Sequence, residues 1–418
     1  MQKYLIQGGH KLSGEIKVAG AKNAALKIMA AGILSDESLI VKNAPDIEDI
    51  SRMKEILENL GAKISRDGAI LTIDPKEIKQ SNPDPELVRK LRSSVMLAGP
   101  LLARFGEVTL AHPGGCIIGK RPIDLFLAGF KAMGAKIFDH QGDGFYSLKA
   151  KRLHGAKIIL PWVAVTATES LMMTACLAEG TTTITNAAME PEIPALAAYL
   201  NSGGAKISGA GTPVIRIEGV EKLSGGEYEL IPDRIEAGSF AIMGLATESE
   251  IKITNCRPEH LETELFMLQK AGGNLEIGPD YIITKPSKLH GVELRTHEYP
   301  GFATDLQAPF TVLMTQAAGQ SLIHETIYDG RLFYTDKLAQ MGANIILCDP
   351  HRVVVGGSSR LVGKKLESPD LRAGMALLIA GLVARGETTI ENIYQIERGY
   401  EKLVERLQGL GAKIEKVE

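Results

Sequence analysis

A cysteine set among glycines and cations is the first candidate for chemistry in this sequence. Cys116 lies within the loop Pro113-Gly114-Gly115-Cys116-Ile117-Ile118-Gly119-Lys120-Arg121-Pro122. Neighbouring cations favour the thiolate, which is the reactive form of cysteine, and the glycines would let the loop move as a lid. We therefore expect Cys116 to be functional. The other cysteines have no such neighbours and are expected to be buried and inert: Cys176, Cys256 and Cys348.

Cationic side chains recur where helices are expected to begin. Equivalent helices of the repeats described below start near Lys22, Arg92, Thr168, Arg234, Asp305 and Arg372. Because a helix N-terminus already carries partial positive charge, a cation there costs stability unless an anion binds. Three more arginines stand beside a proline or glycine near the second helices: Arg121, Arg331 and Arg398. Any one could be a solvated surface charge, but together they predict a site for a small polyanion such as a phosphorylated metabolite.

Asp305 is a carboxylate at a position where sister helices carry Lys or Arg. It could cap its helix by accepting backbone N–H groups, which is a purely structural role. It could also act as a general base among cations. The sequence of this loop leaves both interpretations open.

The elements that must position these residues come in repeats. A phrase that begins with glycine recurs six times at intervals of about 70 residues. Its copies are Gly61-Ala62-Lys63-Ile64, Gly134-Ala135-Lys136-Ile137, Gly204-Ala205-Lys206-Ile207, Gly272-Gly273-Asn274-Leu275, Gly342-Ala343-Asn344-Ile345 and Gly411-Ala412-Lys413-Ile414. The glycine follows an amphipathic stretch and is expected to end a helix, after which a hairpin follows, over residues 64–73 in the first copy. The pattern thus predicts a helix, a strand, a second helix and a hairpin in each unit.

Six such units divide the 418 residues naturally into two domains of three. The best internal boundary is Ser224-Gly225-Gly226, between the third and fourth copies. Two N-terminal strands, Tyr4–Ile6 and Glu15–Val18, precede the first repeat helix and are candidates to pair with the C-terminal half. Periodicity alone does not decide where they go.

Composition and charge exclude several classes of protein. With 47 Lys+Arg against 50 Asp+Glu, the net charge of −3 argues against nucleic-acid and anionic-membrane partners. The first twenty residues contain no apolar export segment, and the longest apolar run, residues 373–384, is too short for a bilayer and predicts a buried helix. The scattered cysteines and histidines predict neither a zinc site nor a disulfide framework. We expect a cytoplasmic α/β protein with no metal and no cofactor.

Several longer motifs carry a resemblance that covers nearly the whole chain. They are Gly20-Ala21-Lys22-Asn23-Ala24-Ala25, residues 113–124, Tyr299-Pro300-Gly301-Phe302-Ala303-Thr304-Asp305, Glu325-Thr326-Ile327 with Arg331, Asp370-Leu371-Arg372-Ala373-Gly374 and Glu397-Arg398-Gly399-Tyr400. In these motifs the sequence resembles the enolpyruvyl transferases. The resemblance implies two "inside-out" α/β-barrel domains of three similar units each. It places the N-terminal strands in the C-terminal domain, so the expected domains are residues 22–229 and residues 1–21 plus 230–418, with the active site in the cleft between them.

The likeness is to those enolpyruvyl transferases that use UDP-N-acetylglucosamine. It implies transfer of the enolpyruvyl group of phosphoenolpyruvate to the 3′-hydroxyl of that sugar nucleotide with release of phosphate, the first committed step of peptidoglycan synthesis. Cys116 would be the proton donor, able to become covalently attached to phosphoenolpyruvate, and the target of fosfomycin-type inhibitors. Asp305 would accept the hydroxyl proton. Lys22 and Arg398 complete the implied catalytic set.

The same resemblance assigns the binding residues. Phosphoenolpyruvate carries a phosphate and a carboxylate, and forked guanidinium groups bind both well. Lys22, Arg121 and Arg398 would hold the phosphate, Arg331 and Arg372 the carboxylate, and Asn23 would lie where phosphoenolpyruvate meets the sugar. The residues implied for the nucleotide sugar are Asn23, Arg92, Arg121, Pro122, Ile123, Asp124, Leu125, Val163, Ala164, Val165, Asp305 and Ile327.

The sequence departs from the family at the nucleotide end. Family members usually show a Lys-Val-Ser-Val-Gly-Ala-Thr-Glu stretch, and here it is Trp162-Val163-Ala164-Val165-Thr166-Ala167-Thr168-Glu169. Phe126 also stands where a histidine is common. We therefore expect weaker or altered nucleotide binding. Trp162 is either a replacement contact or plain packing.

Two other functions remain open. One is the shikimate-pathway enolpyruvyl transferase, which does not rely on a cysteine such as Cys116. The other is a catalytically silent paralogue that binds a nucleotide sugar and regulates a partner. The joint presence of five expected functional residues argues against silence: Lys22, Cys116, Asp305, Arg372 and Arg398.

Overall fold

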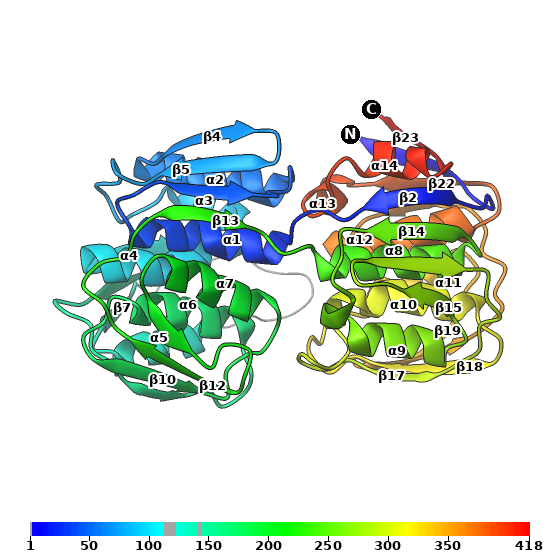
Figure 1. The fold of residues 1–418 in the computed structure, drawn as a ribbon. Coiled ribbons are helices and arrows are strands. Elements are labelled where there is room, and N and C mark those ends of the chain that lie inside the picture. The colour runs from blue at the N-terminus through cyan, green and yellow to red at the C-terminus, as the bar shows by residue number, and fades with distance from the viewer. Residues whose placement is uncertain (1, 113–122, 141–143) are drawn as a thin grey trace. The chain divides into compact units, whose positions relative to one another are not determined.

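The structure is a computed structural model that describes residues 2–112, 123–140 and 144–418. Cys116, Arg121 and Pro122 therefore lie outside the described residues. The chain divides into two compact units, which Figure 1 shows as separate groups of helices and strands. Of the described residues, the N-unit contains 20–112, 123–140 and 144–231, and the C-unit combines residues 2–19 with residues 232–418.

The described residues form six small sheets, three in each unit. The N-unit sheets have the orders β13-β3-β5-β4, β6-β8-β7 and β11-β12-β10-β9. Their strands are β3 Leu39–Lys42, β4 Lys63–Asp67, β5 Ile70–Asp74, β6 Glu107–Ala111, β7 Lys136–His140, β8 Phe145–Lys149, β9 Lys157–Ile159, β10 Thr181–Thr185, β11 Lys206–Ser208, β12 Val214–Glu218 and β13 Gly226–Glu229.

The C-unit sheets have the orders β15-β16-β14-β2, β17-β18-β20-β19 and β21-β22-β1-β23. Their strands are β1 Lys3–Gln7, β2 Ser13–Lys17, β14 Glu250–Thr254, β15 Asn274–Ile277, β16 Tyr281–Lys285, β17 Glu293–Arg295, β18 Gln320–His324, β19 Asn344–Asp349, β20 Arg352–Gly356, β21 Lys365–Glu367, β22 Glu387–Glu391 and β23 Lys413–Val417.

Helices alternate with the strands along the chain in each unit. Those of the N-unit are α1 Lys22–Ala31, η1 Gly32–Leu34, α2 Glu48–Leu60, α3 Pro85–Lys90, η2 Arg92–Leu97, α4 Ala98–Phe105, α5 Asp124–Ala132, α6 Val165–Ala175 and α7 Glu192–Ser202. Those of the C-unit are α8 Arg234–Ala246, η3 Pro258–His260, α9 Glu262–Lys270, α10 Thr304–Gln316, α11 Thr335–Gln340, α12 Leu371–Val383, α13 Tyr394–Glu397 and α14 Leu403–Gly409. In the C-unit α10 packs against α8 and α12, and all three are buried around nearly their whole circumference. Such helices are apolar on every face because no face meets water, and α12 confirms the buried helix predicted over residues 373–384.

The first glycine of every repeat phrase has a left-handed backbone. The φ angles are 112°, 96°, 99°, 90°, 98° and 89° at Gly61, Gly134, Gly204, Gly272, Gly342 and Gly411. Glycine adopts this region without the steric cost that other residues bear, which explains its recurrence at these positions. After the first of these glycines, β4 and β5 form the predicted antiparallel hairpin, with Lys63 opposite Asp74.

The N-terminal strands belong to the C-unit, as the resemblance implied. β1 pairs antiparallel with both β22 and β23, and β2 pairs parallel with β14. Among the described residues, no helix combines the length and the apolar character needed to cross a membrane.

Two of the predicted helix starts need correction. α6 begins at Val165 rather than near Thr168, because the Thr168 N–H donates to the Ala164 carbonyl at 2.9 Å and closes an earlier turn. Arg92 opens the 3₁₀ segment η2, and regular α-helix follows only from Ala98. Pro100 accounts for this delay because it lacks the N–H that a longer α-helix would need.

Candidate active site

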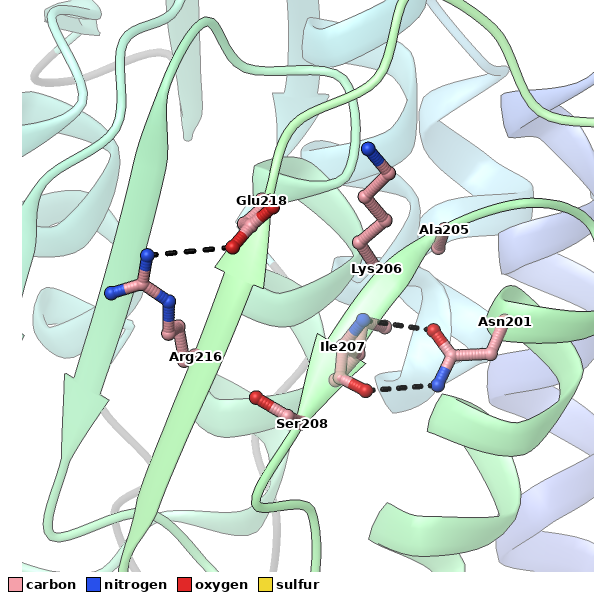
Figure 2. Close-up of a pocket in the computed structure, with 7 residues that line it drawn as sticks. All are labelled: Asn201, Ala205, Lys206, Ile207, Ser208, Arg216 and Glu218. Carbon is pink, nitrogen blue, oxygen red and sulfur yellow. Dashed lines mark hydrogen bonds and ion pairs between the residues drawn. The ribbon is translucent and has the colours of Figure 1, made fainter.

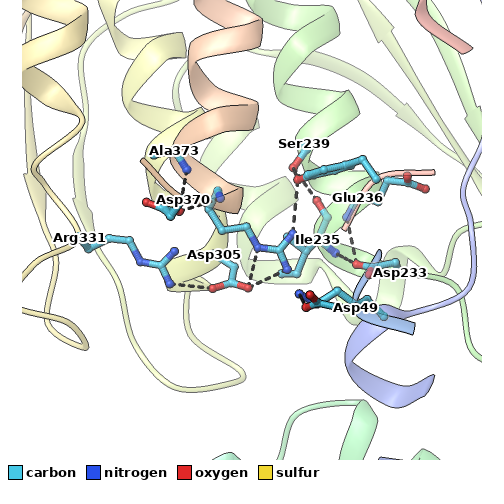
Figure 3. A network of polar contacts seen from close by, with 12 residues as sticks. Asp49, Asp233, Ile235, Glu236, Ser239, Asp305, Arg331, Asp370 and Ala373 are labelled. Atoms are coloured by element: carbon cyan, nitrogen blue, oxygen red, sulfur yellow. Dashed lines mark hydrogen bonds and ion pairs between the residues drawn. The ribbon is translucent and has the colours of Figure 1, made fainter. Parts of the chain in front are cut away.

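Two arginines hold the carboxylate of Asp305 in the C-unit (Figure 3). Arg331 Nη2 lies 2.9 Å from Oδ1, and Arg372 Nε and Nη2 each lie 2.9 Å from Oδ2. Asp305 is the second residue of α10, and the residue that precedes that helix, Ala303, makes no side-chain cap. Asp305 thus does not stand at the N-cap position of its helix, and its side chain contacts the two arginines.

A helix cap places Arg372 in this cluster. Asp370 Oδ1 accepts the N–H groups of Arg372 at 2.8 Å and Ala373 at 3.1 Å, so α12 begins where its second residue is the arginine. Asp233 caps the sister helix α8 in the same way, at 2.8 and 3.1 Å from two backbone nitrogens. Aspartate is a preferred N-cap because its oxygen satisfies N–H groups that have no partner within the helix.

Glu325 connects the two segments that carry Asp305 and Arg331, a role that was not predicted from the sequence. Its Oε2 accepts the Thr304 hydroxyl at 2.8 Å, and its Oε1 accepts the backbone N–H groups of Ile327 at 2.8 Å and Tyr328 at 3.2 Å. The side chain is fully buried, and this burial raises the pKa of Glu325. The signal that could have found it was its place in the motif Glu325-Thr326-Ile327.

Arg372 is enclosed on its other side by Tyr400. The Nη1 atom lies 3.4 Å from the tyrosine hydroxyl oxygen, and the guanidinium carbon lies 6.0 Å from the ring centre. Burial by itself would lower the pKa of Arg372, but the charge of Asp305 raises it above its ordinary value. Arg398 directly follows α13, on the turn that also carries Tyr400, and donates to Gln395 Oε1 at 3.1 Å.

In the N-unit, the expected phosphate-binding lysine is paired with a carboxylate. Lys22 and Asn23 form the start of α1, and Lys22 Nζ lies 2.8 Å from Asp49 Oδ2. Asp49 is buried near the start of α2. This pairing could not be predicted from the sequence, because no spacing rule links residues of two different helices. Arg92 stands at the first position of η2.

The stretch expected to bind the nucleotide leads into a helix. Val163 and Ala164 precede α6, and Val165 is its first residue. Trp162 is 54% exposed, so the structure does not support its interpretation as a packing residue. A second group stands at the start of α5: Ile123, Asp124, Leu125 and the buried Phe126.

A buried ion pair joins α1 to α6, and the sequence did not predict it. Lys27 Nζ lies 3.4 Å from Glu169 Oε2, and both side chains are almost completely enclosed. Burial is the main cause that raises the pKa of Glu169 to about 7; Lys27 opposes the rise, and Glu190 and Glu192 add to it. The pair therefore links the helix that begins with Lys22 to the helix that begins with Val165.

The remaining cysteines of the described residues lie outside the arginine cluster. Cys116 lies outside the described residues; Cys176 and Cys256 are buried, and burial raises the pKa of each thiol to about 12. Cys348 is exposed, which corrects the expectation of burial, because β19 is an edge strand.

A hollow of about 300 Å³ on β11 and β12 (Figure 2) contains none of the predicted site residues. Within residues 2–112, 123–140 and 144–418, no group of three or more His, Cys, Asp or Glu side chains is arranged to hold a metal ion.

Comparison with known proteins defines the class of this one. A family model described as EPSP synthase (3-phosphoshikimate 1-carboxyvinyltransferase) matches residues 6–407. The chain belongs to this family, the enolpyruvyl transferases, and is a transferase of mixed α/β fold.

Its relatives sharpen the assignment within the family. A protein of Halothermothrix orenii named UDP-N-acetylglucosamine 1-carboxyvinyltransferase is 46% identical over 420 residues, which cover 100% of both chains. One of Carboxydothermus hydrogenoformans, named UDP-N-acetylglucosamine 1-carboxyvinyltransferase 1, is 46% identical, with 100% of this chain and 99% of that protein covered.

Solved structures show the same fold. The enolpyruvyl transferase NikO from Streptomyces tendae superposes with a TM-score of 0.91 at 26% identity, covering 100% of this chain and 99% of that one. EPSP synthase from Acinetobacter baumannii reaches a TM-score of 0.75 at 20% identity, with both chains fully covered. The second likeness supports the fold alone.

Proposed function

We propose that this protein transfers the enolpyruvyl group of phosphoenolpyruvate to the 3′-hydroxyl of UDP-N-acetylglucosamine and releases phosphate. The acceptor follows from the relatives at 46% identity over the full length, whose names specify it. The observation that carries the chemistry is the carboxylate of Asp305 between two buried guanidinium groups. The product would enter peptidoglycan synthesis, in the cytoplasm and without a cofactor.

The arginine cluster suits one end of phosphoenolpyruvate. Arg331 and Arg372 offer forked N–H groups, which now donate hydrogen bonds to Asp305. The carboxylate of a substrate could accept hydrogen bonds from the same N–H groups. A bound carboxylate would draw the guanidinium groups toward itself and release Asp305 to take the proton of the attacking hydroxyl. Lys22, Arg121 and Arg398 are proposed to hold the phosphate, which leaves as charge develops on it.

The remaining assignments rest on the resemblance. Cys116 is proposed to donate a proton to the methylene carbon of phosphoenolpyruvate and to be alkylated by fosfomycin-type inhibitors. The nucleotide sugar is proposed to contact Asn23, Arg92, Asp305 and Ile327 together with residues 121–125 and 163–165. Three of these groups stand at helix starts, at the beginnings of α1, α5 and α6. The backbone N–H groups at a helix start attract anions such as a diphosphate, which supports the proposal.

We further infer that each unit is an inside-out α/β barrel of three repeats. The six sheets and the six left-handed glycines support this reading. The domains would be residues 22–229 and residues 1–21 plus 230–418.

A phosphate-release assay with two acceptors tests the function. Phosphoenolpyruvate is supplied with either UDP-N-acetylglucosamine or shikimate 3-phosphate, and release with the first alone is expected. Release with only the second would favour the shikimate-pathway activity, which the description of the family model names. No release with either, alongside measurable ligand binding, would indicate a silent paralogue.

A further inference from the structure

Tyr400 is buried against the arginine cluster, and its hydroxyl contacts two polar side chains. Arg372 Nη1 lies 3.4 Å and Ser239 Oγ lies 3.1 Å from the tyrosine oxygen. These residues come from three separate segments, namely α12, α8 and the turn after α13. Figure 3 shows Ser239 and Ile235 of α8 near the Asp305 cluster.

The direction of each hydrogen bond in this chain can be assigned. Ser239 has one hydroxyl proton and donates it to the Ile235 carbonyl at 2.7 Å. In the contact with Ser239, Tyr400 must therefore be the donor. Burial raises the pKa of Tyr400, so its hydroxyl keeps the proton that this requires. The lone pairs of the tyrosine oxygen remain as acceptors for Arg372 Nη1.

The backbone of the same turn is fixed by a close approach. A Cβ at Gly399 would lie 2.8 Å and 2.9 Å from the two terminal methyl carbons of Leu371, the first residue of α12. A side chain at position 399 would have to push the Leu371 side chain aside, so glycine allows the turn to approach the start of α12 closely. Tyr400 is thus held beside Arg372 by packing as well as by polar contacts.

We propose that Tyr400 is a positioning residue that orients the guanidinium group of Arg372 toward Asp305 and the substrate carboxylate. The hydroxyl binds Nη1 at one corner of the planar group, which leaves the edge formed by Nε and Nη2 to face Asp305. Since the tyrosine proton is committed to Ser239, the arginine meets a fixed acceptor rather than a rotating one. This inference rests on the proposed function, in which Arg372 binds the carboxylate of phosphoenolpyruvate.

Tyr400→Phe tests the inference, because it removes one oxygen and keeps the buried ring. We expect the KM for phosphoenolpyruvate to rise about three- to tenfold, the net cost of losing one typical hydrogen bond, because the contact of 3.4 Å is long. The KM for UDP-N-acetylglucosamine and the unfolding temperature should stay close to those of the wild type. Tyr199→Phe is the matched control, since Tyr199 is also buried but lies on α7 of the N-unit.

The outcomes separate this inference from the function on which it rests. An unchanged KM for phosphoenolpyruvate in an active enzyme overturns the positioning role. So does an equal rise of both KM values with a lower unfolding temperature, which indicates a purely structural tyrosine. If the wild type releases no phosphate with either acceptor, the proposed function itself is wrong, and the role of Tyr400 falls with it.

Discussion

Arg372 Nε donates a hydrogen bond of 2.9 Å to Asp305 Oδ2, and Nη2 lies at the same distance from that oxygen. One carboxylate oxygen thus meets one complete edge of a guanidinium group. This contact joins residues 67 positions apart, at the starts of two neighbouring buried helices. It stabilises the ionised carboxylate, so a base at this position must first be released by a competing anion.

Replacing Asp305 with Ala should separate binding from turnover. We expect kcat to fall by about 10²- to 10⁴-fold, as for loss of a general base. Binding of phosphoenolpyruvate, measured by calorimetry, should be unchanged or tighter because two guanidinium groups lose their protein partner. Asp280→Ala, at an exposed position of the C-unit, is the control. A nearly normal kcat in Asp305→Ala would show that the general-base assignment is wrong.

Cys116 should be the target of fosfomycin. Cys116→Ala or Cys116→Ser is expected to resist alkylation, which is measured by intact-protein mass and by residual activity. Cys348→Ser is the matched control because Cys348 is the exposed cysteine among the described residues. If Cys116→Ala is still inactivated and Cys348→Ser is protected, the reactive thiol is Cys348.

Nucleotide affinity should report on the altered stretch before α6. We expect isothermal titration to give weaker binding of UDP-N-acetylglucosamine than the micromolar affinity ordinary for such a site, and Trp162→Ala to change it further. Ile159→Ala is the control, since Ile159 is exposed on the adjacent strand β9 but lies outside the stretch. Ordinary micromolar affinity in the wild type would contradict the expectation, and an unchanged value in Trp162→Ala would remove the tryptophan from the site.

The buried Lys27–Glu169 pair predicts a pH dependence of stability. Folding raises the pKa of Glu169 from 4.5 to about 7, so the folded state binds this proton more tightly than the unfolded state. The contribution of Glu169 to the free energy of unfolding should therefore fall as the pH rises from about 4.5 to about 7. Replacing both residues with Met should flatten this slope and leave stability at pH 8 equal or up to about 3 kcal/mol higher.

Chemical denaturation at several pH values measures this effect. The control pair is Lys285 and Glu276, which is exposed and joined at 2.8 Å. Its replacement by Met should change the stability little, because exposed ion pairs contribute little, and should leave the slope between pH 4.5 and 7 in place. A Lys27/Glu169 double variant that keeps the slope of the wild type across that window would contradict the role given to Glu169.

The features predictable from sequence were those set by local conformational demands. Gly61 and its five counterparts mark helix ends because a left-handed backbone favours glycine at each of them. Lys22 and Arg372 could also be placed near helix starts, because aligning the repeats puts each of them at the beginning of an equivalent helix. Pairings between distant segments could not be derived in this way. Only the resemblance predicted that β1 belongs to the C-unit.

The partners of the site residues were also beyond sequence reasoning. Glu325 and Tyr400 stand in motifs of the resemblance, but neither these motifs nor the position of Asp49 shows which side chains these residues contact. Lys27 and Glu169 look like ordinary helix-surface residues, yet both are buried. Cys348 shows the opposite error, because the preference of cysteine for the interior does not hold on an edge strand.

The position of β1 between β22 and β23 has a consequence for biosynthesis. A ribosome makes β1 before every other strand described here, but the two neighbours of β1 are the last to emerge. The residues of the N-unit lie in the sequence between β2 and the remaining strands of the C-unit. The N-unit can therefore fold while β1 and β2 have no partner strands. Unpaired strands invite association with other chains. The interval between synthesis of the N-unit and of the final strand is thus the period in which the nascent protein is most exposed to aggregation.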